Sequence, residues 1–175
     1  DFLRIYPAVA IEGTALARSF AEGTYRPLSL SAAVSLCKVM LHRSFVAGIP
    51  VIRMGLQPTR ELEREGTVVA GPFHPAFRQL VESEIFFDLL LRLLSEGEPD
   101  AAPLSLRCAP SRISDVIGQG RSNMRRLAQR GVRIASVRPD GLLSPTKIAV
   151  EGDAVVRTAD ILSDLHYTLE DAIHV

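Results

Sequence analysis

The chain has 175 residues, of which 47% are hydrophobic, and its 20 basic and 20 acidic side chains give a formal net charge of zero. This length and composition are typical of a globular protein with one domain or two small ones. They argue against a membrane span, because no apolar run approaches the roughly 20 residues that a span requires. Cys37 and Cys108 lie far apart, so they predict neither a disulfide nor a metal site and fit a reducing cytoplasm.

The first part of the chain predicts a strand–helix–strand unit. Thr14 and Ser29 precede apolar helical patterns as N-cap residues, and Gly23 and Gly48 follow these patterns as stop signals. The predicted elements, in chain order, are a strand at 2–11, a short helix that ends at 21, a longer helix at 30–47 and a strand at 49–56.

Two strands joined by such a crossover pair in parallel, and a parallel sheet is covered on both faces. Two strands alone cannot meet this requirement. We therefore expect an α/β fold in which this part is a truncated barrel segment, built from βαβ units, with the missing N-terminal half of the barrel as its partner.

The middle of the chain predicts a solvated turn, a connection and a long helix. Charged residues fill 60–66, and 66–75 is rich in turn residues. Pro75 suits the first position of a helix that Gly97 ends. Because the segment EGEPDAAP at 96–103 has linker composition, we place a domain boundary there and divide the chain into 1–98 and 99–175.

The second part predicts a small α+β domain. Its expected elements, in chain order, are a strand at 104–109, a helix at 111–118, a tight loop at 118–121, a helix at 121–131, a strand at 132–138, a turn at 139–145, a strand at 146–152 and a final helix at 153–172.

Three stretches of the first part carry a resemblance to a known family. They are FLRIYPAVAIEGTAL at 2–16, EGTYRPLSLSAAV at 22–34 and IPVIRMGLQPT at 49–59. In order and spacing they resemble the catalytic subunit of Elongator and its bacterial relatives, which are radical S-adenosylmethionine (SAM) enzymes. The run AGPFHPAFRQLVESEI at 70–85 resembles a bacterial branch, and the likeness covers residues 1–98.

The resemblance implies a partial triosephosphate-isomerase-like barrel and a parent enzyme that binds SAM at a 4Fe–4S cluster held by cysteines spaced C-x3-C-x2-C, a motif that this sequence lacks. We expect the chain alone to bind neither group and to be inactive. Active sites of such barrels lie at the C-terminal ends of the strands, so Tyr6, Arg53, Gly55 and Gln57 are candidate cofactor contacts. The alternative for these residues is a strand that ends in an ordinary turn.

His74, in the stretch GPFHPAF, lies at the predicted start of the long helix. A helix N-terminus lowers the pKa of a histidine, so His74 is a candidate acid–base group. A capping or packing role is the favoured alternative. No two histidines have the spacing of metal ligands, so we predict no zinc site.

The second part resembles a type I K-homology domain in the order strand, helix, GxxG-type loop, helix, strand, strand, helix. The anchor of this resemblance is DVIGQGRSNMRRL at 115–127, in which Arg121 stands where the family has a glycine. The resemblance implies that the loop clamps a nucleic-acid backbone. The residues assigned to nucleic-acid binding are Gly118, Gln119, Gly120, Arg121, Asn123, Arg125 and Arg126.

The distribution of charge independently favours a phosphate-rich partner, such as tRNA or another RNA. Residues 104–138 contain eight arginines against a single acid, Asp115, whereas residues 160–171 contain four acids. No aromatic residue in 104–138 is available to stack on bases. The alternative is therefore an interaction or docking domain without RNA binding. We also expect unpaired strand edges to favour a homo-oligomer.

Overall fold

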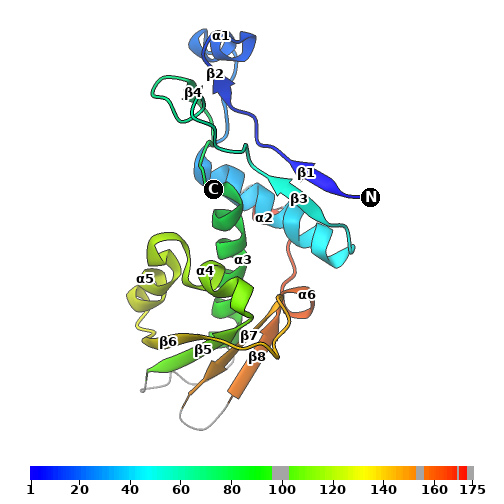
Figure 1. Cartoon of the computed structure of the whole chain (residues 1–175), viewed down its shortest axis with the longest axis vertical. Coiled ribbons are helices and arrows are strands. Elements are labelled where there is room, and N and C mark those ends of the chain that lie inside the picture. The colour runs from blue at the N-terminus through cyan, green and yellow to red at the C-terminus, as the bar shows by residue number, and fades with distance from the viewer. Residues whose placement is uncertain (96–102, 153–155, 169, 173–175) are drawn as a thin grey trace. The chain divides into compact units, whose positions relative to one another are not determined.

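The computed structural model describes residues 1–95, 103–152, 156–168 and 170–172. The chain divides into two compact units, shown in Figure 1. The first unit contains Asp1–Arg78 together with a C-terminal piece that starts at Thr168, and the second unit contains Gln79–Tyr167. The second unit is thus inserted in the sequence between two parts of the first. The predicted boundary between residues 98 and 99 lies outside the described residues.

The first unit contains two small sheets and two principal helices. Strands β1 (Leu3–Ile5) and β3 (Val51–Met54) pair in parallel, and α2 (Leu30–Val46) connects them across a βαβ crossover. Strands β2 (Ala10–Ile11) and β4 (Val68–Ala70) pair antiparallel, beside helix α1 (Ala15–Ala21). The 3-10 turn η3 (Glu170–Ala172), near the chain end, contacts α2.

The sequence signals for the two helices are confirmed. The Thr14 hydroxyl oxygen accepts a hydrogen bond from the Ala17 N–H at 3.2 Å, and the Ser29 hydroxyl accepts one from the Ala32 N–H at 3.1 Å. These bonds satisfy amide groups that the first helical turn leaves unpaired. Gly48 follows the C-cap residue Ala47 of α2 and has a φ of +67°, which glycine adopts at no steric cost.

The predicted strand at 2–11 is in fact two strands in two different sheets, because β1 ends at Ile5 and β2 begins at Ala10. The stretch expected to be only a connection, 66–75, contains β4. Parallel pairing of the first and third strands is confirmed. Each sheet of this unit has two strands, and no barrel closes within the described part of the chain.

The second unit is a four-stranded sheet with helices packed against it. Helix α3 (Phe77–Leu94) begins at the end of the first unit and continues into the second. The sheet has the order β6-β5-β7-β8, in which β6 is parallel to β5 and the other pairs are antiparallel. The strands are β5 (Leu104–Cys108), β6 (Ile134–Pro139), β7 (Lys147–Glu151) and β8 (Val156–Asp160).

The crossover from β5 to β6 contains α4 (Ile113–Ile117) and α5 (Ser122–Gln129), preceded by the 3-10 turns η1 (Pro110–Arg112) and η2 (Gln119–Arg121), respectively. Leu106 of β5, Val116 of α4, Leu127 of α5 and Ile148 of β7 are all fully buried, at 0% exposure. Each of the four elements contributes one of these side chains to the core. Burying such side chains supplies the main driving force for this unit.

The predicted final helix at 153–172 is wrong. Residues 156–160 form β8, whose Arg157 and Ala159 lie opposite Val150 and Ile148 of β7. Pairing with β7 outweighs the helix-forming tendency of this segment, because β-branched residues fit a pleated surface well. A short helix, α6 (Ile161–Asp164), follows, and its N-cap Asp160 accepts from the Leu162 N–H at 3.0 Å.

Among the described residues, no helix is both long enough and apolar enough to cross a membrane.

Candidate functional site

The candidate cofactor residues lie at the C-terminal ends of β1 and β3. The Gly55 N–H donates to the Ile5 carbonyl oxygen at 2.9 Å, which brings Tyr6 and Gly55 to the same end of the parallel pair. Tyr6, Arg53 and Gln57 are exposed. A Cβ atom on Gly55 would lie 2.7 Å from Cβ of Phe77, and the φ of Gly55 is +77°. The glycine is therefore required for close packing of Phe77, whatever its relation to a ligand.

His74 makes the contact of a capping residue. Its Nδ1 accepts a hydrogen bond from the Ala76 N–H at 3.1 Å, and its carbonyl oxygen accepts one from the Phe77 N–H at 3.0 Å. The side chain is half-buried just before α3. Its acid–base role stays a prediction, and the geometry agrees with the capping alternative.

The loop at 118–121 has an unusual backbone. Gly118 and Gly120 have φ values of +78° and +55°, and Arg121 has +64°. Arg121 is the one non-glycine residue with a positive φ in the described chain. A left-handed conformation costs a residue with a Cβ about 1–2 kcal/mol. The position that the K-homology resemblance reserves for glycine thus has a glycine-like backbone, although an exposed arginine occupies it.

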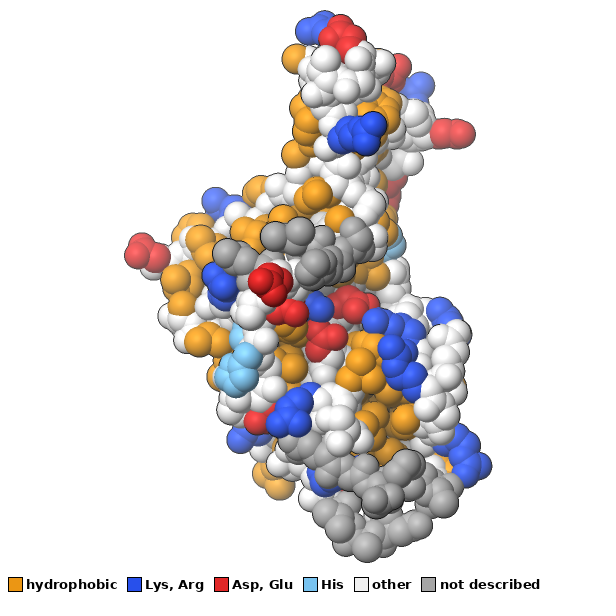
Figure 2. Space-filling view, turned by 180° about the vertical axis from the view of Figure 1, so that it is seen from behind, with side chains coloured by type: hydrophobic (Ala, Val, Ile, Leu, Met, Phe, Trp, Pro, Cys, Tyr) orange, Lys and Arg blue, Asp and Glu red, His pale blue; other side chains and the backbone are white. Residues whose placement is uncertain are grey.

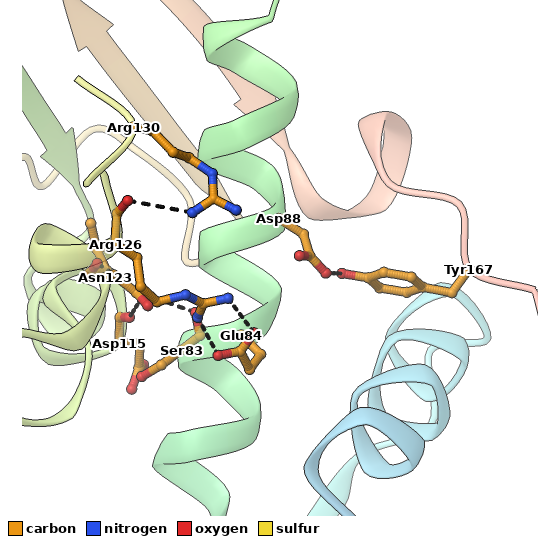
Figure 3. A network of polar contacts seen from close by, with 9 residues as sticks. Ser83, Glu84, Asp88, Asp115, Asn123, Arg126, Arg130 and Tyr167 are labelled. Atoms are coloured by element: carbon orange, nitrogen blue, oxygen red, sulfur yellow. Dashed lines mark hydrogen bonds and ion pairs between the residues drawn. The ribbon is translucent and has the colours of Figure 1, made fainter. Parts of the chain in front are cut away.

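Asn123 is completely buried, at 0% exposure. Its side-chain amide donates to three backbone carbonyl groups, those of Ser83 (2.9 Å), Asp115 (3.3 Å) and Val116 (3.3 Å). Figure 3 shows it between α5 and α3. To contact a nucleic acid, Asn123 would have to break these hydrogen bonds. In the structure the bonds hold the start of α5 against α3 and α4.

Arg126 is also engaged within the unit. Its guanidinium donates to both carboxylate oxygens of Glu84 (Figure 3), the longer of these bonds being 3.2 Å. The guanidinium also lies 3.5 Å from the ring centroid of Phe87. Arg130 lies 5.3 Å from the same centroid and donates to the Arg126 carbonyl oxygen at 3.4 Å. This group, Glu84, Phe87, Arg126 and Arg130, is called the α3–α5 clamp below.

Other arginines of the basic stretch have acidic partners. Arg112 pairs with Glu82 at 3.2 Å and with Asp115 at 3.1 Å. Arg107 pairs with Asp140 and Glu151 at 3.1 and 2.8 Å. The excess of arginine in the sequence is therefore partly compensated by acids from distant segments.

Two exposed arginines remain beside the loop at 118–121. Arg125 donates to the Gly120 carbonyl oxygen, and the Arg121 side chain has no ion pair with any residue that the structure describes. Figure 2 shows several Lys and Arg side chains, in blue, beside hydrophobic side chains on the face of the molecule seen from behind. Of the residues assigned to nucleic-acid binding, Arg121 and Arg125 are thus the charged groups that are accessible without breaking an ion pair.

The cysteines do not form a cluster site. Burial raises the pKa of both Cys37 and Cys108 to about 11, so both are neutral thiols near pH 7. Cys37 lies in the first unit and Cys108 in the second. No group of three or more histidine, cysteine, aspartate or glutamate residues in the described ranges could hold a metal ion. The residues present here do not fit a 4Fe–4S cluster, which takes thiolate ligands.

Comparison with known proteins identifies the class of the first part. Residues 1–86 match the family described as the Radical_SAM C-terminal domain. This match covers just under half of the chain and includes β1 to β4 and the start of α3. The radical SAM assignment made from the sequence is confirmed at this level. No curated protein and no solved structure matches the chain.

Sequence reasoning missed the partners that α3 supplies. Ser83, Glu84 and Phe87 lie about 40 residues before the arginines and the asparagine that they contact. One signal was available, namely the pair of acids Glu82 and Glu84 in a helix otherwise rich in apolar residues. Buried or half-buried acids require cationic partners, and the arginines of 104–138 were the obvious supply.

Proposed function

We propose that this chain is the C-terminal portion of a radical SAM iron–sulfur enzyme related to the Elongator catalytic subunit, and that its second unit holds an RNA substrate. The observation that supports the enzyme class is the match of residues 1–86 to the Radical_SAM C-terminal domain. In such an enzyme a 4Fe–4S cluster and SAM would supply radical chemistry. The described residues of this chain do not fit that cluster, and they would shape the substrate side.

The accessible charges of the second unit support RNA as the substrate class. Arg121 and Arg125 lie at the start of α5, next to the glycine loop, and both are exposed. At Gly120 a Cβ would meet nothing within 4 Å, so the backbone there is open to a close neighbour. Guanidinium groups bind phosphate in bidentate fashion, and each phosphate neutralised makes binding more sensitive to salt.

The test is binding of the full chain to a mixed tRNA pool at low and at moderate salt. Arg121→Ala/Arg125→Ala should weaken binding at low salt and lower the slope of log affinity against log salt by about 1.5–2, since two phosphate contacts are lost. The matched control is Arg60→Ala/Arg64→Ala, which removes the same charge from exposed positions of the first unit. Equal binding by the two variants would contradict the proposal.

A second candidate function, a docking domain without RNA binding, is favoured by one observation. Arg107, Arg112 and Arg126 are all paired with acids inside the unit. Because these arginines already have acidic partners within the unit, fewer positive charges are left to bind the phosphate groups of a ligand. The absence of tRNA binding by the unaltered chain at low salt would support this alternative.

A further inference from the structure

Two polar side chains lie inside the core of the second unit, where α3 meets the start of α5. Ser83 of α3 is 3% exposed, and Asn123 of α5 is 0% exposed. The Asn123 amide nitrogen, Nδ2, donates to the Ser83 carbonyl oxygen at 2.9 Å, so the two residues are in direct contact (Figure 3). Buried polar atoms are almost always hydrogen-bonded, because burial removes their bonds to bulk water. The side-chain oxygens of this pair depart from that rule.

The Ser83 hydroxyl oxygen, Oγ, and the Asn123 amide oxygen, Oδ1, are both buried without a hydrogen-bond partner among the described residues. The orientation of the Asn123 amide is fixed by its nitrogen, which donates to three backbone carbonyl groups. Rotating the amide by half a turn would bring Oδ1 against the same three carbonyl oxygens, which are acceptors too. Oδ1 therefore gains no partner from an exchange of the two amide atoms.

Ser83 also lacks the partner that a helix offers to a serine. Such a serine can donate to the carbonyl oxygen four residues earlier, as Ser44 of α2 does to Met40 at 2.8 Å. The Ser83 hydroxyl makes no such bond within α3. It therefore keeps both its donor and its acceptor capacity for a group outside the helix.

A water molecule meets the requirements of both oxygens. It can donate to Asn123 Oδ1, which only accepts, and it can donate to or accept from Ser83 Oγ, which does both. Another buried atom without a hydrogen-bond partner, Arg112 Nε, belongs to the same network. Arg112 pairs with Asp115, whose carbonyl oxygen accepts from Asn123. Polar sites with roughly two to four such partners hold buried waters, whereas apolar cavities stay dry.

We propose that Ser83 Oγ and Asn123 Oδ1 together bind one buried water molecule, which joins α3 to the start of α5 beside the loop at 118–121. The loop backbone rests against this site, because a Cβ on Gly118 would lie 3.0 Å from Cγ of Asn123. The water thereby holds Asn123 in place, and Asn123 supports the backbone from which Arg121 extends. The inference concerns the folded unit itself and holds equally for an RNA-binding and a docking domain.

A crystal structure of the full chain tests the inference directly. We expect an ordered water within hydrogen-bonding distance, about 2.7–3.2 Å, of both Ser83 Oγ and Asn123 Oδ1. A structure in which no water contacts both atoms, for example because the Ser83 hydroxyl donates to the Gln79 carbonyl oxygen, would overturn the inference. This measurement needs no variant, so it stands even where a substitution prevents folding.

The variant Ser83→Ala gives a thermal test whose sign separates the two cases. With the water, alanine removes one of its anchors and leaves the Asn123 oxygen poorly bonded, so the melting midpoint should fall by about 3–6 °C. Without the water, alanine removes a buried unpaired hydroxyl and favours the helix, so the midpoint should rise. Ser44→Ala is the matched control and should leave the midpoint nearly unchanged, because the backbone of α2 keeps its own hydrogen bonds. An unchanged or raised midpoint in Ser83→Ala would contradict the bound water.

Amide hydrogen exchange in the same variant measures the coupling of the water to the loop. The Arg121 N–H donates to the Gly118 carbonyl oxygen at 2.9 Å. Its exchange should be at least about three-fold faster in Ser83→Ala than in the unaltered chain, because the loop loses support. An unchanged exchange rate would refute the role of the water in holding the loop.

Discussion

Replacing Arg126 with alanine should destabilise the second unit, because Arg126 is the centre of the α3–α5 clamp. Its guanidinium contacts both carboxylate oxygens of Glu84 and one face of the Phe87 ring. Both contacts join α5 to α3, two elements that lie about 40 residues apart in the sequence. The substitution removes them together while leaving the helix-forming tendency of α5 intact, since alanine is the best helix former.

The expected loss follows from the exposure of the groups. The side chains of Arg126 and Glu84 are 35% and 31% exposed, so solvent screens the ion pair, which contributes about 0.5–1 kcal/mol. A guanidinium stacked on a buried ring adds about 1 kcal/mol. The free energy of unfolding should therefore fall by about 1.5–2 kcal/mol, which at this chain length lowers the thermal midpoint by about 3–8 °C.

Scanning calorimetry of the full chain measures this change, with Arg121→Ala as the matched control. Both variants lose one arginine from the region of α5, but Arg121 is exposed and has no ion pair. A double variant with Glu84→Gln should lose less than the sum of the two single changes, because both remove the same pair. Equal midpoints for Arg126→Ala and Arg121→Ala would refute the clamp.

Two further predictions concern the first unit and the thiols. Gly55→Ala should lower the thermal midpoint by several degrees, because the new Cβ would lie 2.7 Å from Phe77 in a left-handed backbone; an unchanged melting curve would contradict this. Cys37 and Cys108 should react slowly with a disulfide reagent at pH 8 in the folded chain and rapidly once it is unfolded, because burial raises both pKa values to about 11. A free thiol has a pKa near 9.0. The contribution of these neutral buried thiols to the free energy of unfolding should therefore be complete below that pH and fall as the pH rises towards 11. Denaturant titrations across this pH range measure the change.

Local signals in the sequence predicted the helices of the first unit well. Thr14 and Ser29 cap helices where expected, because a cap depends on residues three positions away. The final helix was predicted wrongly because pairing overrides the local pattern. Residues 156–160 read as helical in isolation, but they pair with the preceding strand β7, and β7 is itself held in the sheet by β5, which lies about 40 residues earlier in the chain.

The same distinction applies to the candidate sites. The tight loop that begins at Gly118 follows from local sequence and was predicted from it. The internal roles of Asn123 and Arg126 depend on α3, so spacing alone could not separate these residues from their accessible neighbours. Local patterns therefore located the basic loop, while the packing of the unit decided which of its residues are accessible.

The insertion of the second unit between two parts of the first affects the order in which the chain can fold during synthesis. Helix α2 ends at Val46, but η3, which contacts it, begins only at Glu170. All of Gln79–Tyr167 therefore leaves the ribosome before α2 can acquire this contact. Contacts between residues so far apart in sequence form slowly, so a nascent chain would carry a finished second unit while the first still lacks its last piece.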